Sequence, residues 1–131
     1  MLTDGQGVPL VATLTAANVP DVQQLLPLVV NVPAVRGKRG RPRSRPDQVV
    51  ADKAYDCQPA RDLLHWLGID TFIPKRRTQP HGLGRVRWVI ERTLSWFHQF
   101  RRLRTRHDRH AEVHEALLQL GCAMICWNFL K

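Results

Sequence analysis

The sequence is poor in acidic residues. Asp and Glu together number 11 against 20 Lys and Arg, which leaves a formal net charge of +9. The expected partner is a polyanion whose counterions are released on binding, with nucleic acid first and an acidic membrane surface second.

Long apolar runs and paired cysteines are also missing. No stretch reaches the roughly 20 apolar residues that a membrane-spanning helix needs. The most apolar segment, 116–130, contains Gln119 and Asn128, so it is expected to be a core helix. Three cysteines, an odd number, without a signal-peptide pattern predict reduced thiols in a cytoplasm. Cys122 and Cys126 are interpreted as small buried hydrophobic residues.

The first 30 residues indicate a hairpin followed by a short helix. Asp4 to Gly7 has the composition of a turn, and a β-branched segment from Val8 to Thr15 follows it. Only three residues precede the turn, so the chain is expected to begin within a structural unit. Pro20 suits a first helical turn, and Pro27 is expected to kink or end the apolar helix that follows.

A basic loop is predicted at about 36–46, RGKRGRPRSRP, which contains no apolar side chain able to enter a core. Its centre, 39–43, is similar to an AT-hook, in which two arginines lie along the narrow minor groove of A·T-rich DNA. A mobile basic loop that contacts phosphates is the favoured alternative. The predicted DNA-binding residues here are Arg36, Lys38, Arg39, Arg41, Arg43 and Arg45. Lys75, Arg76 and Arg77, in a later loop, are added to them.

The middle of the chain alternates strand and helix signals. A β-branched run at 48–52 ends in Asp52, which places a carboxylate at the end of a buried strand. Pro59 opens a helix that Gly68 closes, and 69–73 reads as a second strand. The expected fold is therefore α/β or α+β, with helices in the last two fifths.

Residues 82–106, GLGRVRWVIERTLSWFHQFRRLRTR, are predicted to form one long helix. Apolar residues recur at spacings of three and four, which predicts one buried face. These residues are Val86, Val89, Ile90, Leu94, Phe97, Phe100 and Leu103. Glu91 is the only carboxylate in the segment. Taken alone, it is more simply explained as a solvated acid paired with a basic neighbour one turn away.

A last helix is expected from about 112 to 130. Its predicted buried residues are Val113, Leu117, Leu120, Met124 and Trp127. Before it, His107, His110 and His114 can share one helical face, for which a surface basic patch is favoured over a zinc site.

The motifs VVADKAYD at 49–56 and GLGRVRWVIERTLSWFHQFRRLRTR at 82–106 resemble the carboxyl-terminal part of bacterial insertion-sequence transposases with a DDE catalytic centre. Four shorter stretches resemble the same family in the same order: 4–10, 15–21, 36–47 and 117–127. The resemblance covers nearly the whole chain. It implies a ribonuclease-H-like fold and DNA transposition by metal-dependent cleavage and joining of DNA ends.

The resemblance also implies the site residues. Asp52 matches the second family aspartate and Glu91 the family glutamate, so both are expected to hold divalent metal ions, with Mg²⁺ preferred and Mn²⁺ possible. Arg87 matches the arginine of the family's Y-R-E-K signature and completes the expected catalytic set. Gly84 and His98 stand where the signature has tyrosine and lysine, so these two positions depart from it.

The family's first catalytic aspartate lies on a strand upstream of the DGxGxPL turn, where this sequence begins. The chain is therefore expected to be a partial catalytic domain, 1–131, that lacks the first strand and one metal ligand and is inactive alone. The expected partners are double-stranded DNA at element ends and target, with a second copy or a full-length transposase as further partners and no membrane. The expected location is the bacterial cytoplasm, at the nucleoid. A noncatalytic basic DNA-binding fragment is the alternative function.

Overall fold

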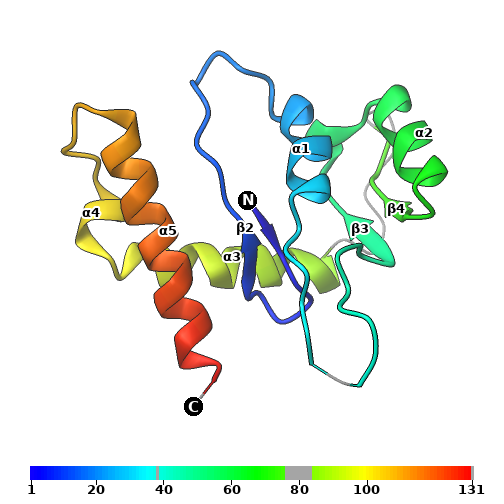
Figure 1. Ribbon diagram of the computed structural model, residues 1–131. Helices are drawn as coiled ribbons and strands as arrows, with labels where there is room; N and C mark the ends of the chain where they lie inside the picture. The colour runs from blue at the N-terminus through cyan, green and yellow to red at the C-terminus, as the bar shows by residue number, and fades with distance from the viewer. Residues whose placement is uncertain (38, 76–83, 131) are drawn as a thin grey trace. The chain divides into compact units, whose positions relative to one another are not determined.

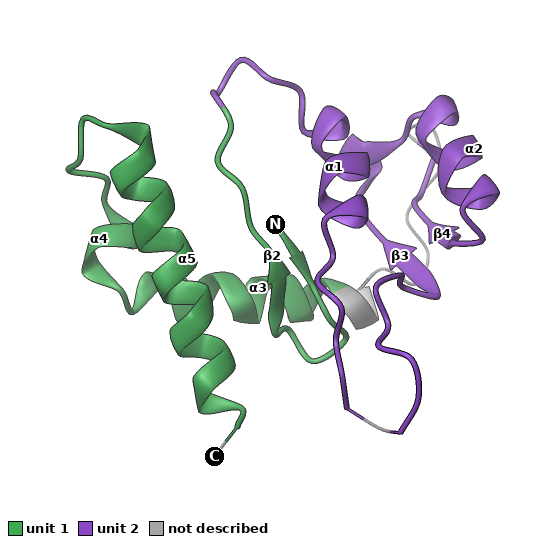
Figure 2. Ribbon diagram, in the orientation of Figure 1, with its two compact units in different colours: residues 1–15, 84–131 green, residues 16–83 purple. Residues whose placement is uncertain are grey.

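The computed structural model describes residues 1–37, 39–75 and 84–130, with only the backbone described for 84–86. The chain divides into two compact units (Figures 1 and 2). Unit 1 comprises residues 1–15 and 84–131, and unit 2 comprises residues 16–83. Both helices and strands are present, as predicted. None of the described helices is long and apolar enough to cross a membrane.

Unit 1 begins with the predicted hairpin. Strands β1 (Leu2–Thr3) and β2 (Pro9–Val11) pair antiparallel. The Asp4 carboxylate accepts hydrogen bonds from the backbone N–H groups of Gln6 at 2.9 Å and Val8 at 2.8 Å. Asp4 therefore shapes the turn, as its position predicts.

The predicted long helix is interrupted, which corrects the expectation for 82–106. Helix α3 (Gly84–His98) ends before Gln99, and α4 (Arg101–Arg104) is a separate single turn. Phe100 between them has extended backbone angles. Helix α5 (Ala111–Asn128) then closes the chain close to its predicted bounds. The apolar spacing continues across the break, so periodicity alone did not reveal it.

The apolar face of α3 is only partly buried, contrary to the sequence prediction. Val89 and Phe97 are buried, but Ile90 and Leu94 are exposed. The described contact between the hairpin and α3 is at the turn, where Gly7 meets Thr93. A two-stranded hairpin is too small to cover a helix of four turns, so the remaining apolar residues stay in solvent.

The same correction applies to α5. Gly121 and Ile125 are its buried residues. Leu117 is only partly buried, and the other four residues that were predicted to be buried are exposed: Val113, Leu120, Met124 and Trp127. The helix is apolar on more than one face, so one packed face leaves the others uncovered.

Unit 2 has a parallel strand pair as its centre. Strand β3 (Gln48–Val50) pairs with β4 (Asp70–Phe72), and α2 (Gln58–Trp66) connects them. This is the crossover that parallel strands require. The buried apolar cluster contains Leu25, Val29, Val49, Ala60, Leu64, Ile69 and Ile73.

The segment before β3 differs from prediction at Pro27. A 3₁₀ turn η1 (Asp21–Gln24) precedes α1 (Leu25–Val30), so the helical segment changes character before Pro27 rather than at it. Pro27 lies in the first turn of α1, where its missing N–H has no intrahelical partner to lose. The helix therefore continues through it.

Candidate functional site

Asp52 lies just beyond the carboxyl end of β3, as the sequence predicts. It caps the 3₁₀ turn η2 (Lys53–Tyr55), and its Oδ1 accepts a hydrogen bond from the Ala54 backbone N–H at 2.5 Å. Asp52 is exposed. A short polar side chain at this position forms the turn, and its exposed carboxylate remains accessible to a ligand.

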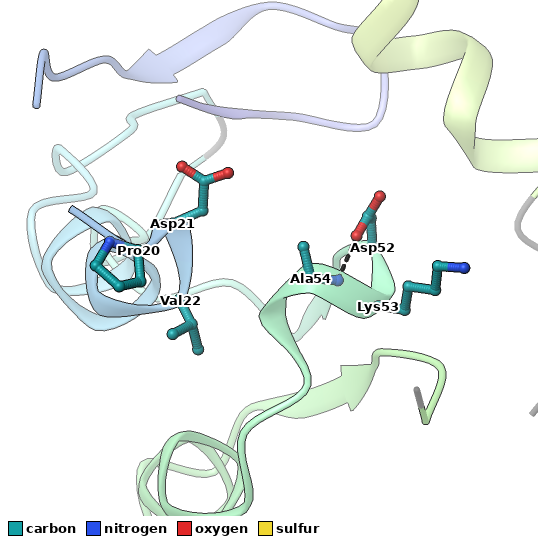
Figure 3. Close-up of a pocket in the computed structure, with 6 residues that line it drawn as sticks. All are labelled: Pro20, Asp21, Val22, Asp52, Lys53 and Ala54. Carbon is teal, nitrogen blue, oxygen red and sulfur yellow. Dashed lines mark hydrogen bonds between the residues drawn. The ribbon is translucent and has the colours of Figure 1, made fainter. Parts of the chain in front are cut away.

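A pocket of unit 2 contains Asp52. Its lining comes from the start of η1 and from η2: Pro20, Asp21, Val22, Asp52, Lys53 and Ala54. Figure 3 shows the carboxylates of Asp21 and Asp52 on its two sides. Burial raises the pKa of the nearby Tyr55 hydroxyl, and the negative charges of Asp21 and Asp52 raise it further.

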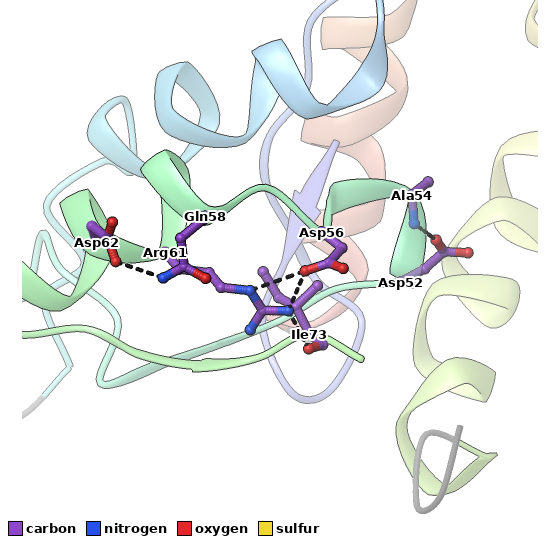
Figure 4. A network of polar contacts seen from close by, with 7 residues as sticks. All are labelled: Asp52, Ala54, Asp56, Gln58, Arg61, Asp62 and Ile73. Carbon is purple, nitrogen blue, oxygen red and sulfur yellow. Dashed lines mark hydrogen bonds and ion pairs between the residues drawn. The ribbon is translucent and has the colours of Figure 1, made fainter. Parts of the chain in front are cut away.

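A partly buried ion pair supports the turn that carries Asp52. The Arg61 guanidinium donates to Asp56 Oδ1 at 2.7 Å and to the Ile73 carbonyl at 2.6 Å (Figure 4). Arg61 thus joins α2, the segment after η2 and the end of β4. The sequence prediction did not include this link, because the contact of Arg61 with the Ile73 carbonyl forms only when α2 packs against β4.

Glu91 lies on α3 in unit 1. Its Oε1 accepts a hydrogen bond from Arg87 Nε at 2.9 Å, and the two side chains are 60% and 77% exposed. This is the solvated pair one turn apart that the residues alone favoured. Asp52 belongs to unit 2, so its sharing of a metal ion with Glu91 stays a prediction.

The turn of the hairpin contacts α3 at Arg92 and Thr93, the two residues that follow Glu91. Thr93 is fully buried, and its hydroxyl lies 2.6 Å from the Gly7 carbonyl, to which it donates. Arg92 donates to the Gln6 carbonyl. The Arg92 guanidinium also stacks against Trp88 on the same helix, 4.4 Å from its ring centroid. The two residues after Glu91 therefore fix the rotation of α3 relative to the turn.

The predicted DNA-binding arginines of the basic loop are exposed, as expected. They are Arg36, Arg39, Arg41, Arg43 and Arg45. Arg43 forms an ion pair with Asp47 at 2.7 Å, and its backbone pairs with Val35. Lys75 is exposed. Lys38, Arg76 and Arg77 lie outside the described residues.

The described part of the chain contains no cluster of three potential metal-binding side chains. No group of three or more His, Cys, Asp or Glu side chains there is placed to hold an ion. Asp21 and Asp52 are two carboxylates that line one pocket.

Comparison with known proteins decides the family. The family model for the transposase DDE domain matches residues 1–129. The chain belongs to this family. Such domains generally use divalent metal ions.

A curated relative is described as "Putative transposase for insertion sequence element IS402" of Burkholderia cepacia. It is 53% identical over 132 residues, covering 100% of this chain and 63% of the relative. The chain thus spans less than two thirds of the length of that relative. No solved structure matches the chain.

Proposed function

We propose that the chain contributes to DNA transposition as part of a DDE transposase that cleaves and joins DNA ends by metal-dependent phosphoryl transfer. The family match carries the proposal. The proposed architecture is the ribonuclease-H-like fold. The parallel pair β3 and β4 with its helical crossover supports it, because that fold contains such a unit.

Asp52 is proposed as a metal ligand and catalytic residue. It follows a buried strand, and η2 and the ion pair of Arg61 with Asp56 hold its backbone. One carboxylate oxygen caps the turn, which leaves the other available to an ion. A fixed backbone with an accessible carboxylate is what metal-assisted phosphoryl transfer requires.

The exposed carboxylate of Asp52 suits a hard divalent cation, because oxygen ligands are what Mg²⁺ and Mn²⁺ prefer. Asp21 also lines the pocket but does not belong to the assigned ligand set. When bound, such an ion would supply charge stabilisation and activation of the nucleophile. Lys53, on the same lining, adds a positive charge that can contact a phosphate. Mg²⁺ is the proposed cofactor, with Mn²⁺ as its substitute.

Glu91 and Arg87 complete the proposed set. The Arg87 guanidinium donates to the Glu91 carboxylate, and Arg87 can exchange this contact for a DNA phosphate. Thr93 and Arg92 keep the helix in register with the hairpin turn while this exchange takes place. Glu91 is thus proposed as the second metal ligand and Arg87 as a phosphate-binding residue.

The proposed partner is double-stranded DNA at the ends of an element and at its target, in the bacterial cytoplasm. The exposed arginines of the basic loop are proposed to bind its phosphates, and Lys75 to Arg77 to extend that contact. Assembly with a second copy or with a full-length transposase is proposed as well.

A noncatalytic DNA-binding role is the second candidate. The exposed pair of Arg87 with Glu91 favours it, since a solvated acid paired in this way needs no metal.

Metal binding separates the two candidates. Mn²⁺ titration followed by electron paramagnetic resonance compares the chain with Asp52→Asn and with Asp62→Asn. Asp62 is an exposed acid on α2 that serves as the matched control. We expect Asp52→Asn to weaken binding at least about tenfold and Asp62→Asn to leave it unchanged. Equal binding by all three would favour the noncatalytic role.

DNA cleavage tests the ligand assignment. With Asp52 and Glu91 as its assigned ligands, the chain is expected not to nick supercoiled plasmid in Mg²⁺ or Mn²⁺, because two carboxylates cannot hold both ions in line. Cleavage that disappears in Asp52→Ala would refute this and point to Asp21 or Asp4 as a third ligand.

DNA binding tests the basic loop. Arg39→Ala/Arg41→Ala should weaken binding to all duplexes alike if the loop contacts phosphates. A loss confined to A·T-rich duplexes would instead favour insertion into the minor groove.

A further inference from the structure

Residues 101–110, RRLRTRHDRH, form an arginine-rich segment that the proposed site does not use. It contains five arginines and one carboxylate, Asp108. All five arginines are exposed. Within the part of the chain that the structure describes, Arg101, Arg104 and Arg109 have no ion pair or side-chain hydrogen bond. The segment therefore presents uncompensated charge to solvent.

Packing against α5 decides which way α4 faces. Leu103, the one apolar residue of α4, lies directly over Gly121 of α5, beside Phe97. A Cβ atom on Gly121 would stand 2.8 Å from Leu103 Cδ1 and 3.2 Å from a ring carbon of Phe97. Figure 1 shows α4 beside α5. With Leu103 fixed against α5, Arg101 and Arg104, the exposed residues at either end of the turn, remain in solvent.

Asp108 orders the loop that follows α4. Its Oδ1 accepts a hydrogen bond from Arg102 Nη1 at 3.1 Å, and its backbone carbonyl accepts one from Arg106 Nε at 3.1 Å. The Asp108 side chain is 15% exposed. The Asp108 side chain therefore holds Arg102, and its backbone carbonyl holds Arg106. The loop keeps its shape while Arg101, Arg104 and Arg109 remain available.

The two unpaired arginines of α4 lie close enough together to contact neighbouring phosphates. Helix α4 rises only about 6 Å over its four residues, and Arg101 and Arg104 are its first and last residues. Duplex DNA carries one negative charge per roughly 1.7 Å of axis, and so three or four charges over the same length. Arginine also presents a planar fork of donors that suits phosphate oxygens.

We propose that Arg101, Arg104 and Arg109 form a second DNA-binding surface of this chain, which holds the phosphate backbone of double-stranded DNA without reading its sequence. The ordered position of α4 on Gly121 and of its loop on Asp108 lowers the conformational entropy lost on binding. The choice of DNA rests on the proposed function, whereas the site itself rests on the geometry of unit 1.

Fluorescence anisotropy with a labelled duplex of arbitrary sequence, titrated across salt concentrations, tests the surface. Arg101→Gln/Arg104→Gln should raise Kd at least about tenfold and reduce the slope of log K against log salt by about 1.8, since each phosphate contact contributes about 0.9. Arg101→Lys/Arg104→Lys keeps the charge and should retain most of the slope. Circular dichroism should show the same thermal midpoint for both variants.

The double variant Thr15→Glu/Gln23→Glu is the charge-matched control, because it lowers the net charge by the same amount at exposed positions elsewhere. We expect it to change Kd at most about twofold, since screened charges away from the contact contribute little. An unchanged salt slope in Arg101→Gln/Arg104→Gln would overturn the proposal. An equal effect of the control would do the same.

Two further experiments distinguish failure of this surface from failure of the proposed function. If Arg39→Ala/Arg41→Ala alone weakens DNA binding, the surface on α4 fails and the basic loop stands. If polyglutamate binds as tightly as DNA and with the same dependence on Arg101 and Arg104, the ligand is an acidic protein and the DNA assignment fails. The outcome of the Mn²⁺ titration with Asp52→Asn changes the interpretation of neither experiment.

Discussion

The interiors of the two units are built on different principles. Unit 2 buries a contiguous cluster of aliphatic side chains around Leu64. Unit 1 buries fewer apolar side chains, Ala12, Val89, Phe97 and Ile125 among them, and has close contacts where Gly7 meets the fully buried Thr93 and Gly121 meets Leu103. Truncation of a buried side chain should therefore destabilise unit 2 most. Unit 1 should be most sensitive to an added methyl group or a lost hydroxyl.

Removing Leu64 should give the largest effect. Leu64→Ala deletes a completely buried side chain and should lower the free energy of unfolding by about 2–5 kcal/mol, from lost burial and the cavity left behind. Leu63→Ala, at the neighbouring residue that is 47% exposed, is the matched control. Urea unfolding followed by circular dichroism measures both. Equal losses would contradict the aliphatic core assigned to unit 2.

An added methyl group at Gly7 should cause the second-largest loss of stability. Gly7 has φ +84, and a Cβ there would lie 2.8 Å from Thr93 Oγ1. Gly7→Ala should cost about 1–3 kcal/mol through backbone strain and overlap. Gly5→Ala, in the same turn and with open space around it, should cost much less. Similar midpoints in urea for both variants would show that the contact with Thr93 is unimportant.

Loss of the Thr93 hydroxyl should have a somewhat smaller effect. Thr93→Val keeps the shape but leaves the buried Gly7 carbonyl without its donor, which should cost about 1–2 kcal/mol. Thr93→Ser keeps the hydroxyl and is the comparison. Hydrogen exchange of the turn amides supplies the local measurement. Faster exchange in the valine variant than in the serine variant is expected, and the reverse order would refute the anchor.

The pair of Arg87 with Glu91 should contribute least. Both side chains are largely exposed, so a double-mutant cycle with Arg87→Gln and Glu91→Gln should give a coupling of roughly 0.3–0.5 kcal/mol. Thermal unfolding at low and high salt measures it. A coupling above about 1 kcal/mol would mean that the pair is shielded from solvent.

The sequence predicted elements whose signals are local. The hairpin, the two strands of unit 2 and the helix between them follow from turn residues, β-branched runs and capping positions, and the structure contains all of them. Asp52 was placed after its strand for the same reason. The break at Phe100 was missed because Phe97, Phe100 and Leu103 keep helical spacing across it.

Burial and long-range contacts could not be predicted in this way. Helical spacing shows which side chains share a face, but not whether a partner covers them, so Leu94 and Trp127 were wrongly expected to be buried. The links of Arg61 to Ile73 and of Thr93 to Gly7 join residues that approach only after folding. Whether Asp52 and Glu91 meet is a question of the same kind and stays a prediction.

The contact between Thr93 and Gly7 also has a kinetic consequence. It joins residues 86 positions apart, and the whole of unit 2 lies between them in the chain. Closing so long a loop costs more entropy than the local pairing of β3 with β4 through α2. Unit 2 is therefore expected to fold first and to shorten the disordered span. The hairpin should dock on α3 later, as the slower step.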